Sequence, residues 1–416
     1  MKYSKDTMLF FNLQKYAKLL CLEVIFVFLL ISCHSNNTIK SESNDLKLNE
    51  VTSDSIITGA QQIQLLGEFL LNKSVAVVGN QSSIITSEVH LVDTLLSLKY
   101  ELVKVFSPEH GFRGTASAGE HISNSKDEQT GLPIVSLYGD HKKPTTQDLG
   151  GIDLMLFDIQ DVGVRFYTYI STLHYVMEAC AENDIPLIVL DRPNPNGDYI
   201  DGPILEMENK SFVGMHPVPI VHGMTIGEYA QMINGEYWLK DSVQCKLTVI
   251  PCKNYTHNKR YSLPVPPSPN LTSDKSIRLY PSLCLFEATT VSVGRGTETP
   301  FEMYGHPDFP KSDFSFVPRS KTGAAKPKHE NKKCFAFKPE LDLDQKSMSL
   351  AFFLNAKNLL QDKSFINKKS SFIRLAGTEK LYDQIISGLS ESEIRETWKA
   401  DLEKFDERRK KYLIYD

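Results

Sequence analysis

The stretch that decides the fold is residues 101–114, Glu-Leu-Val-Lys-Val-Phe-Ser-Pro-Glu-His-Gly-Phe-Arg-Gly. Its first six residues are mostly apolar and β-branched, which predicts a short buried strand. A proline, an acid, a base and glycines follow at once, so the chain turns as it leaves the strand. Ligands of open α/β sheets bind outside the carboxyl ends of the strands. Glu109 and His110 are therefore candidate functional residues on a loop held by a rigid scaffold, unless they only cap a helix or bond a turn.

Strands and helices alternate on both sides of this stretch. The sequence predicts further strands at 75–78, 154–157 and 186–190, and helices at 90–99 and 171–183. Continuous apolar strands that alternate with helices are typical of a parallel sheet covered on both faces. We expect an α/β fold, with a Rossmann-like parallel-sheet domain at 57–263 and a smaller α+β C-terminal domain at 264–416. Prolines at 264, 266, 267 and 269 mark the expected junction.

The C-terminal region has its own pattern. Apolar spacing predicts helices at 348–360, 378–387 and 393–412, and the basic stretch 312–333 is expected to be an exposed loop.

Polar residues follow all four strands of the predicted sheet. Parallel strands end at one edge of a sheet, so these side chains are expected to converge there. Besides Glu109 and His110 they are Asn80, Gln81, Asp158, Gln160, Asp161, Arg165, Tyr167, Tyr169, Asp191, Arg192 and Asn194. Some must be structural, because an aspartate can cap a helix and an arginine can pair with a carboxylate.

Several function classes lack their sequence signals. The first strand is not followed by G-x-G-x-x-G or by a P-loop, which argues against a nucleotide cofactor. His90, His110, Asp158 and Asp161 are possible metal ligands, but no paired-histidine spacing accompanies them, and no G-x-S-x-G elbow is present. We expect no metal and no cofactor. A net charge of -5 with scattered basic residues argues against a nucleic-acid partner.

The N-terminus resembles a bacterial lipoprotein signal. Basic residues precede an apolar run at 24–31 that is too short to span a bilayer, and Leu-Ile-Ser-Cys at 30–33 resembles a lipobox. We expect removal of residues 1–33 up to a lipidated Cys33, a flexible tether at 34–56, and a lipid-anchored, periplasm-facing protein in the bacterial envelope. The alternative is an uncleaved anchor in which Cys33 is an ordinary cysteine.

Cysteine usage gives no disulfide framework. The chain has seven cysteines, and the odd number left after the N-terminal segment is set aside does not form complete pairs. Cys245 and Cys252 could still pair across a hairpin.

Three longer motifs carry a family resemblance. Residues 108–114 (Pro-Glu-His-Gly-Phe-Arg-Gly), 157–169 (Phe-Asp-Ile-Gln-Asp-Val-Gly-Val-Arg-Phe-Tyr-Thr-Tyr) and 191–195 (Asp-Arg-Pro-Asn-Pro) resemble the NamZ-type exo-β-N-acetylmuramidases, long known only as a domain of unknown function. Segments 222–228, 267–270, 294–297, 374–378 and 394–398 also match. The resemblance covers nearly the whole chain after Ile57. It implies removal of terminal N-acetylmuramic acid (MurNAc) from the non-reducing end of peptidoglycan fragments, and a catalytic glutamate at Glu109.

The chemistry of the candidate residues agrees with this resemblance. Glycosidic cleavage needs an acid that protonates the leaving oxygen, and a second group that acts as base, nucleophile or stabiliser of the developing positive charge. We expect Glu109 to be the acid, with His110 as the alternative. Asp158 or Asp161 could be the second group, or the acetamido group of MurNAc could assist instead. An arginine fork would read the lactyl carboxylate of MurNAc, and we favour Arg165 and Arg192 over Arg295. Further expected substrate-binding residues are Tyr167, Tyr169, His222 and Asn270.

Two alternatives from other classes remain. One is a non-catalytic muropeptide-binding lipoprotein, and the other is a cofactor-dependent oxidoreductase. The sequence does not decide between inversion, retention and substrate assistance, nor does it give the membrane leaflet, the tolerance of peptide stems or the oligomeric state.

Overall fold

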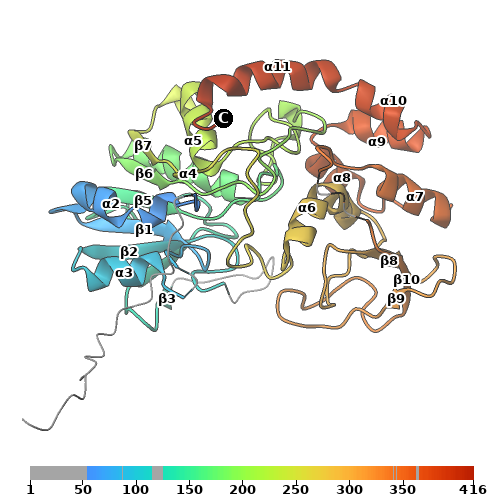
Figure 1. The fold of residues 1–416 in the computed structure, drawn as a ribbon, viewed down its shortest axis with the longest axis horizontal. Coiled ribbons are helices and arrows are strands. Elements are labelled where there is room, and N and C mark those ends of the chain that lie inside the picture. Colours follow the sequence, from blue (N-terminus) through green and yellow to red (C-terminus); the bar gives the residue numbers. More distant parts are fainter. Residues whose placement is uncertain (1–53, 87, 115–124, 341, 343, 362–364) are drawn as a thin grey trace, which may run out of the picture. The chain divides into compact units, whose positions relative to one another are not determined.

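In the part of the chain that the structure describes, a seven-stranded sheet has the order β3-β4-β2-β1-β5-β6-β7 (Figure 1). Its strands are β1 (Val75–Gly79), β2 (Leu102–Ser107), β3 (Ser125–Lys126), β4 (Pro133–Ser136), β5 (Leu154–Asp158), β6 (Leu187–Leu190) and β7 (Leu247–Ile250). All neighbours are parallel except the edge pair β3 and β4. This sheet confirms the predicted α/β fold class.

The computed structural model describes residues 54–86, 88–114, 125–340, 342, 344–361 and 365–416. The predicted signal peptide, Cys33 and nearly all of the predicted tether lie outside these residues. Residues Ile56–Asp416 form a single compact unit. Among the described residues, no helix combines the length and the apolar character needed to cross a membrane.

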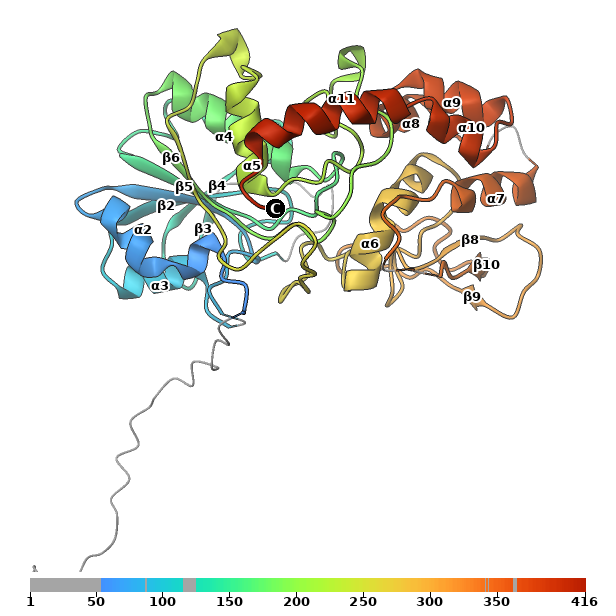
Figure 2. The same cartoon turned by 45° about the horizontal axis from the view of Figure 1, so that its top comes forward.

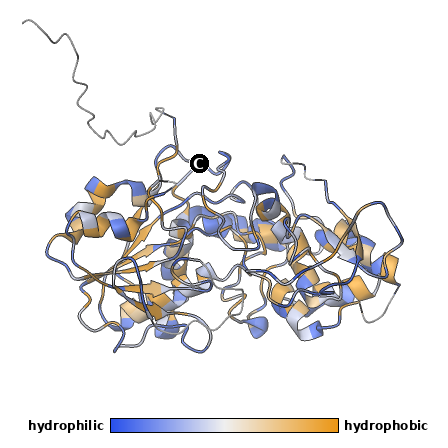
Figure 3. Cartoon of the chain, turned by 90° about the horizontal axis from the view of Figure 1, so that it is seen from below, coloured by the Kyte–Doolittle hydropathy of each residue, from blue (hydrophilic) through white to orange (hydrophobic). Residues whose placement is uncertain are grey.

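The strands form because short runs of β-branched and apolar residues bury both faces of the sheet. Val75 and Val77 pack with α2 (Ile63–Leu70) and α3 (Leu91–Ser97). Ala76 and Val78 pack with α4 (Tyr169–Glu182) and α5 (Ile226–Gly235) on the opposite face. Figure 2 shows the two helix pairs on either side of the sheet, and Figure 3 shows the apolar colour concentrated in the strands between them. Helices therefore cover both faces, as continuous apolar strands require.

The order of the strands creates a crevice at the carboxyl edge. The chain moves from β1 outward to β2 and β4, and then returns to β5, β6 and β7 on the other side of β1. The order thus reverses between β1 and β5, which is where ligands of open α/β sheets bind.

The C-terminal part combines helices with a small antiparallel sheet. Its elements are α6 (Asp274–Leu283), β8 (Tyr304–His306), β9 (Ser315–Phe316), β10 (Cys334–Phe337), α7 (Ala351–Leu360), α8 (Lys369–Ala376), α9 (Glu379–Ile386), α10 (Glu391–Glu396) and α11 (Lys399–Arg409). Short 3₁₀ helices occur in both parts of the chain. Those before the C-terminal part are η1 (Gly59–Gln61), η2 (Met207–Asn209) and η3 (Lys240–Ser242), and those within it are η4 (Cys284–Ala288) and η5 (Lys410–Tyr412). After α11 the chain returns to the large sheet, where the Tyr415 hydroxyl donates to Asp191 Oδ2 at 2.6 Å.

Three sequence expectations need correction. The helix expected at 393–412 is divided into α10 and α11, because the first helix ends at Glu396 and the second begins at Lys399. The stretch 312–333 is not wholly exposed, since it contains β9 and the half-buried Lys328. Cys245 and Cys252 are free, buried thiols and do not form the disulfide that their spacing allowed. The proposed domain boundary at residue 264 stays a prediction.

Candidate active site

A cavity of about 80 Å³ lies at the carboxyl edge of the sheet, between the sheet and the C-terminal part. The loop after β2, the segment before α4, the proline-rich segment, α6 and the loop before β8 all contribute to its wall. The lining residues are Glu109, His110, Phe166, Tyr167, Thr168, Tyr169, Ser268, Asn270, Leu271, Tyr280, Arg295 and Phe301. The structure thus brings together six predicted site residues: Glu109, His110, Tyr167, Tyr169, Asn270 and Arg295.

Glu109 reaches the cavity because the backbone turns sharply after β2. His110 and Gly111 have φ values of 72° and 78°, a left-handed conformation that is easy for glycine and uncommon for histidine. The Glu109 carboxylate is partly exposed and accepts a hydrogen bond from Thr168 Oγ1 at 3.3 Å. Thr168 is the N-cap of α4, whose N-terminus favours nearby negative charge. The turn and the helix together aim the carboxyl group at the cavity.

His110 lies deeper than Glu109. It is buried, and its Nε2 lies 3.4 Å from Ser268 Oγ in the proline-rich segment.

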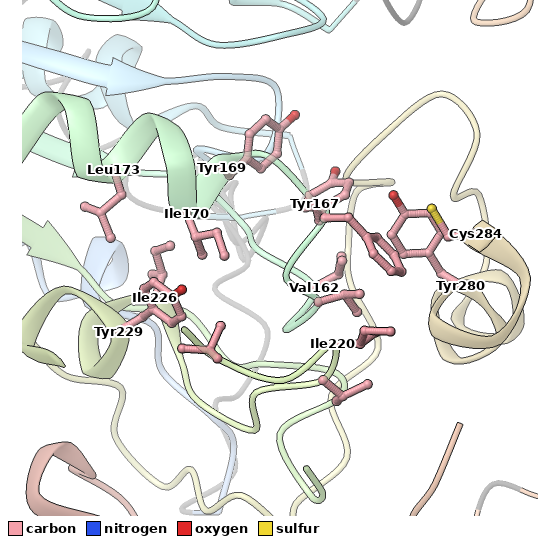
Figure 4. Close-up of a cluster of buried hydrophobic side chains, with 14 of the residues drawn as sticks. Val162, Tyr167, Tyr169, Ile170, Leu173, Ile220, Ile226, Tyr229, Tyr280 and Cys284 are labelled. Atoms are coloured by element: carbon pink, nitrogen blue, oxygen red, sulfur yellow. The ribbon is translucent and has the colours of Figure 1, made fainter. Parts of the chain in front are cut away.

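Aromatic rings form one wall of the cavity, and Figure 4 shows Tyr167, Tyr169 and Tyr280 side by side. Tyr167 packs edge-to-face on Tyr169 at 4.8 Å and on Tyr280 at 6.0 Å between ring centroids. The Tyr167 hydroxyl donates to Pro267 O at 2.7 Å, and Asn80 Nδ2 donates to the Tyr169 hydroxyl at 2.9 Å. Burial raises the pKa of both tyrosines, so their phenols stay neutral. The rings are fixed, and such a wall suits the apolar face of a sugar.

Arg295 enters the cavity from the C-terminal part. Its Nε donates to Glu287 Oε1 at 3.1 Å, and its guanidinium lies 5.0 Å from the centroid of the Phe301 ring. Burial opposes ionisation of Glu287, but the charges of Arg295 and Lys328 outweigh it and lower the pKa of that carboxyl. The structure records no hydrogen bond to another described residue for the two Nη groups of Arg295. They are therefore available to an anionic ligand.

The other two candidate arginines are occupied elsewhere. Arg165 is fully buried, and its Nη groups donate to four backbone carbonyls at 2.6–3.0 Å. Arg192 donates from Nε and Nη2 to Asp158 at 2.6 and 2.9 Å, and both partners are buried. Contrary to our expectation from the sequence, these contacts favour Arg295 over Arg165 and Arg192 as the reader of a substrate carboxylate.

The two candidate partner carboxylates also lie away from the cavity. Asp158 is neutralised by its ion pair with Arg192. Asp161 is buried, with Oδ2 accepting from Gly163 N at 2.7 Å and Oδ1 lacking a partner among the described residues. Burial raises the pKa of Asp161 to about 7. Among the described residues that line the cavity, Glu109 is the only carboxylate.

The remaining predicted residues support the site from behind. Gln81 Nε2 donates to the carbonyls of Pro266 and Pro267 at 3.2 Å, which holds the proline-rich segment against β1. Gln160 donates to the carbonyls of Asp161 and Pro193, and Asn194 donates to Met224 O. Asn270, which lines the cavity, is itself held by a bond from its Nδ2 to Gly323 O. His222 is fully buried, with Nε2 3.8 Å from Asp161 Oδ2.

Sequence reasoning missed several lining residues. Thr168 stands between Tyr167 and Tyr169 in a quoted motif, and its value as an N-cap could have drawn attention to it. Tyr280 and Phe301 carry no local signal, because their roles come from packing against distant segments, and Glu287, which pairs with Arg295 outside the lining, was also missed. Among the described residues, no group of three or more His, Cys, Asp or Glu side chains is placed to hold a metal ion.

Comparison with known proteins agrees with this geometry. The N-terminal model of the NamZ exo-β-N-acetylmuramidase family matches residues 75–275, and its C-terminal model matches residues 278–415. The chain belongs to this family. Membership confirms the resemblance seen in the motifs and the prediction that the chain is a glycosidase.

Individual relatives cover nearly the whole chain. The peptidoglycan β-N-acetylmuramidase NamZ of Bacillus subtilis (strain 168) is 37% identical over 419 residues, 94% of this chain and 100% of that protein. A DUF1343 family crystal structure from Bacteroides fragilis NCTC 9343 is 45% identical with a TM-score of 0.81, and covers 87% of this chain and 99% of its own. A second one from the same organism is 28% identical with a TM-score of 0.75, and covers 87% and 100%.

Proposed function

We propose that this protein is an exo-acting glycoside hydrolase that releases terminal non-reducing MurNAc from peptidoglycan fragments, with Glu109 as the general acid. The observation that carries the proposal is the cavity itself. Among the described residues that line it are one carboxyl group, a wall of tyrosines and an arginine whose Nη groups have no recorded partner, in a chain of the NamZ family.

Glu109 has the position and surroundings of a proton donor. Its carboxyl group faces the cavity beside Thr168, and the other titratable lining group of similar reach, His110, is buried against Ser268. A positioned acid protonates the leaving glycosidic oxygen as the bond to the anomeric carbon breaks.

The second catalytic group comes, in this proposal, from the substrate. Asp158 is paired with Arg192, and Asp161 lies outside the cavity lining. The acetamido oxygen of MurNAc therefore attacks the anomeric carbon while Glu109 protonates the leaving oxygen, and water later opens the cyclic intermediate. This route retains the β configuration, so NMR of the first-formed MurNAc tests it. A first-formed α-anomer would contradict substrate assistance.

Arg295 supplies the specificity for MurNAc. Arg295 lines the cavity, no partner is recorded for its Nη groups among the described residues, and a guanidinium fork matches a carboxylate. N-acetylglucosamine (GlcNAc) lacks the lactyl carboxylate, so it would leave the guanidinium unpaired in a partly dry site.

The deciding experiment compares matched substrates. Purified protein is assayed on nitrophenyl β-MurNAc, on nitrophenyl β-GlcNAc and on the disaccharide MurNAc-GlcNAc. We expect MurNAc release from the first and third, and far slower cleavage of the GlcNAc glycoside. Comparable rates on both nitrophenyl sugars would indicate a generic hexosaminidase. Binding of MurNAc-GlcNAc without turnover would indicate a muropeptide-binding lipoprotein instead.

We also propose that the protein is anchored in the bacterial envelope through lipidated Cys33, facing the periplasm. Support comes from the Leu-Ile-Ser-Cys sequence at 30–33. Several acyl chains together give stable anchoring where a single one does not. Labelled fatty acid should enter the wild-type protein but not the Cys33→Ala variant, and absence of label from wild type would refute the anchor.

A further inference from the structure

A second cavity, of about 380 Å³, is linked to the active-site cavity by the ion pair of Glu287 with Arg295. It lies between the loop that holds Phe212 and helix α8. Its lining residues are Ser211, Phe212, Val213, Glu287, Lys368, Ser371, Arg374 and Leu375. None of these residues belongs to the proposed catalytic set.

Two structural links connect the cavities. Glu287 lines the second cavity and forms the ion pair with Arg295, which lines the first. The other link runs along the first turn of α4, where Thr168 contacts Glu109 and Ser171 Oγ donates to Phe212 O at 2.7 Å. Residues three apart on a helix are neighbours on its surface. The helical turn whose N-cap contacts Glu109 therefore also holds Phe212, which lines the second cavity.

The second cavity is basic. The exposed side chains of Lys368 and Arg374 line it, and Lys142 lies 5.0 Å from the centroid of the Phe212 ring at its edge. The Lys368 ammonium and the Nη groups of Arg374 have no recorded hydrogen bond to a described residue.

Glu287, the single acid among the described residues of this lining, does not cancel the basic charge. Glu287 is balanced by Arg295 and by Lys328, whose pKa burial lowers to about 8 and which is still mostly charged at neutral pH. The field in the cavity therefore attracts an anion.

We infer that this second cavity binds a carboxylate-bearing sugar on the leaving-group side of the scissile bond, that is, a further MurNAc of the glycan chain. The inference rests on the proposed function. A glycan that begins with MurNAc alternates with GlcNAc, so a peptide-free substrate longer than a disaccharide presents a second lactyl carboxylate beyond the cleaved bond. Lys368 and Arg374 are specificity-determining residues for that second carboxylate.

The contribution of these residues appears in binding of long substrates. Exposed ion pairs are weak, and two of them together correspond to about a three- to tenfold change in affinity. They do not touch the reacting bond, so KM changes while kcat does not. Salt should weaken the effect because the groups are exposed to solvent.

The test compares two substrates with the same scissile bond, MurNAc-GlcNAc and the tetrasaccharide MurNAc-GlcNAc-MurNAc-GlcNAc. The variant is Lys368→Ala with Arg374→Ala, and the control is Lys369→Ala. Lys369 is a neighbouring exposed lysine that pairs with Glu379 at 2.6 Å and does not line the cavity. Wild type and control should prefer the tetrasaccharide in kcat/KM. The double variant should lose about three- to tenfold on the tetrasaccharide, through KM, and nothing on the disaccharide.

An unchanged tetrasaccharide preference in the double variant would overturn the inference, and so would an equal loss on both substrates. Failure of the proposed function looks different, because wild type would then release MurNAc from neither substrate. In that case calorimetry with the fragment GlcNAc-MurNAc still decides the inference. Weaker binding to the double variant than to Lys369→Ala supports the anion site, and equal binding overturns it.

Discussion

Replacing Glu109 with glutamine tests the mechanism most directly. The carboxamide keeps the size of the side chain and an oxygen that can accept the hydrogen bond from Thr168. In the wild-type protein this bond joins Thr168 Oγ1 to Glu109 Oε2 at 3.3 Å. It cannot donate the proton that the leaving oxygen needs. No second carboxylate among the described lining residues can replace it, and His110 points toward Ser268. The full contribution of general acid catalysis should therefore be lost.

That contribution is about 10²–10⁴ in rate, or about 3–5 kcal/mol in activation free energy. The loss should fall on kcat for MurNAc-GlcNAc, whose sugar leaving group requires protonation. It should be much smaller for nitrophenyl β-MurNAc, because nitrophenolate leaves with little help. KM should change little, since the tyrosine wall and Arg295 are untouched.

The assay measures kcat and KM of wild type and Glu109→Gln on both substrates, with His110→Asn as the test of the alternative acid. A near wild-type rate of Glu109→Gln on the disaccharide would refute the role of Glu109. Equal losses on both substrates would show that the residue acts through something other than proton donation. A leaving-group-dependent loss in His110→Asn alone would transfer the role to the histidine.

Three further predictions concern other groups. Arg295→Ala should lower the preference for MurNAc over GlcNAc glycosides about tenfold or more, since a charge-assisted bond is lost, and an unchanged ratio of kcat/KM values would contradict this. Arg192→Ala should lower the free energy of unfolding by about 3–5 kcal/mol, because Asp158 is left buried and unpaired; a urea titration showing a change below about 1 kcal/mol would refute it. Asp161, with its pKa raised from 3.8 to about 7, should cost the folded state stability as pH rises from about 4 to about 7. Relative to Asp161→Asn, wild type should lose up to about 4 kcal/mol over that range, and parallel pH profiles would contradict the assignment.

The sheet could be predicted because its signals are local. Continuous apolar runs marked β1, β2, β5 and β6, and polar residues after each run marked the edge where the cavity lies. The division of α10 from α11 was not predictable in the same way. The apolar spacing continues to the buried Trp398, although Thr397 and Trp398 lie between the two helices.

The partners of the candidate residues could not be predicted, because charge and spacing do not reveal distant contacts. Asp158 and Arg192 each follow a strand, and both looked like groups for a ligand. Neighbouring strands β5 and β6 bring them into a buried pair instead. Arg295 carried less weight in the sequence because it belongs to the C-terminal part, yet its position depends on Glu287, eight residues earlier.

Residues 157–169 show why membership in a motif does not by itself give a role in chemistry. Within this one segment, Tyr167 and Tyr169 line the cavity, while Asp158 balances a buried guanidinium. Arg165 bonds the carbonyls of Leu375 and Ala376 at the end of α8, the helix that carries Arg374. Two of its four carbonyl bonds join the segment after β5 to the C-terminal part, so Arg165 connects the two parts that enclose the cavity without lining it. A cavity that is enclosed by two parts of a chain depends on residues that hold the parts together as well as on a catalytic acid. Both types of residue occur in the same sequence motifs, so the motifs alone do not distinguish them.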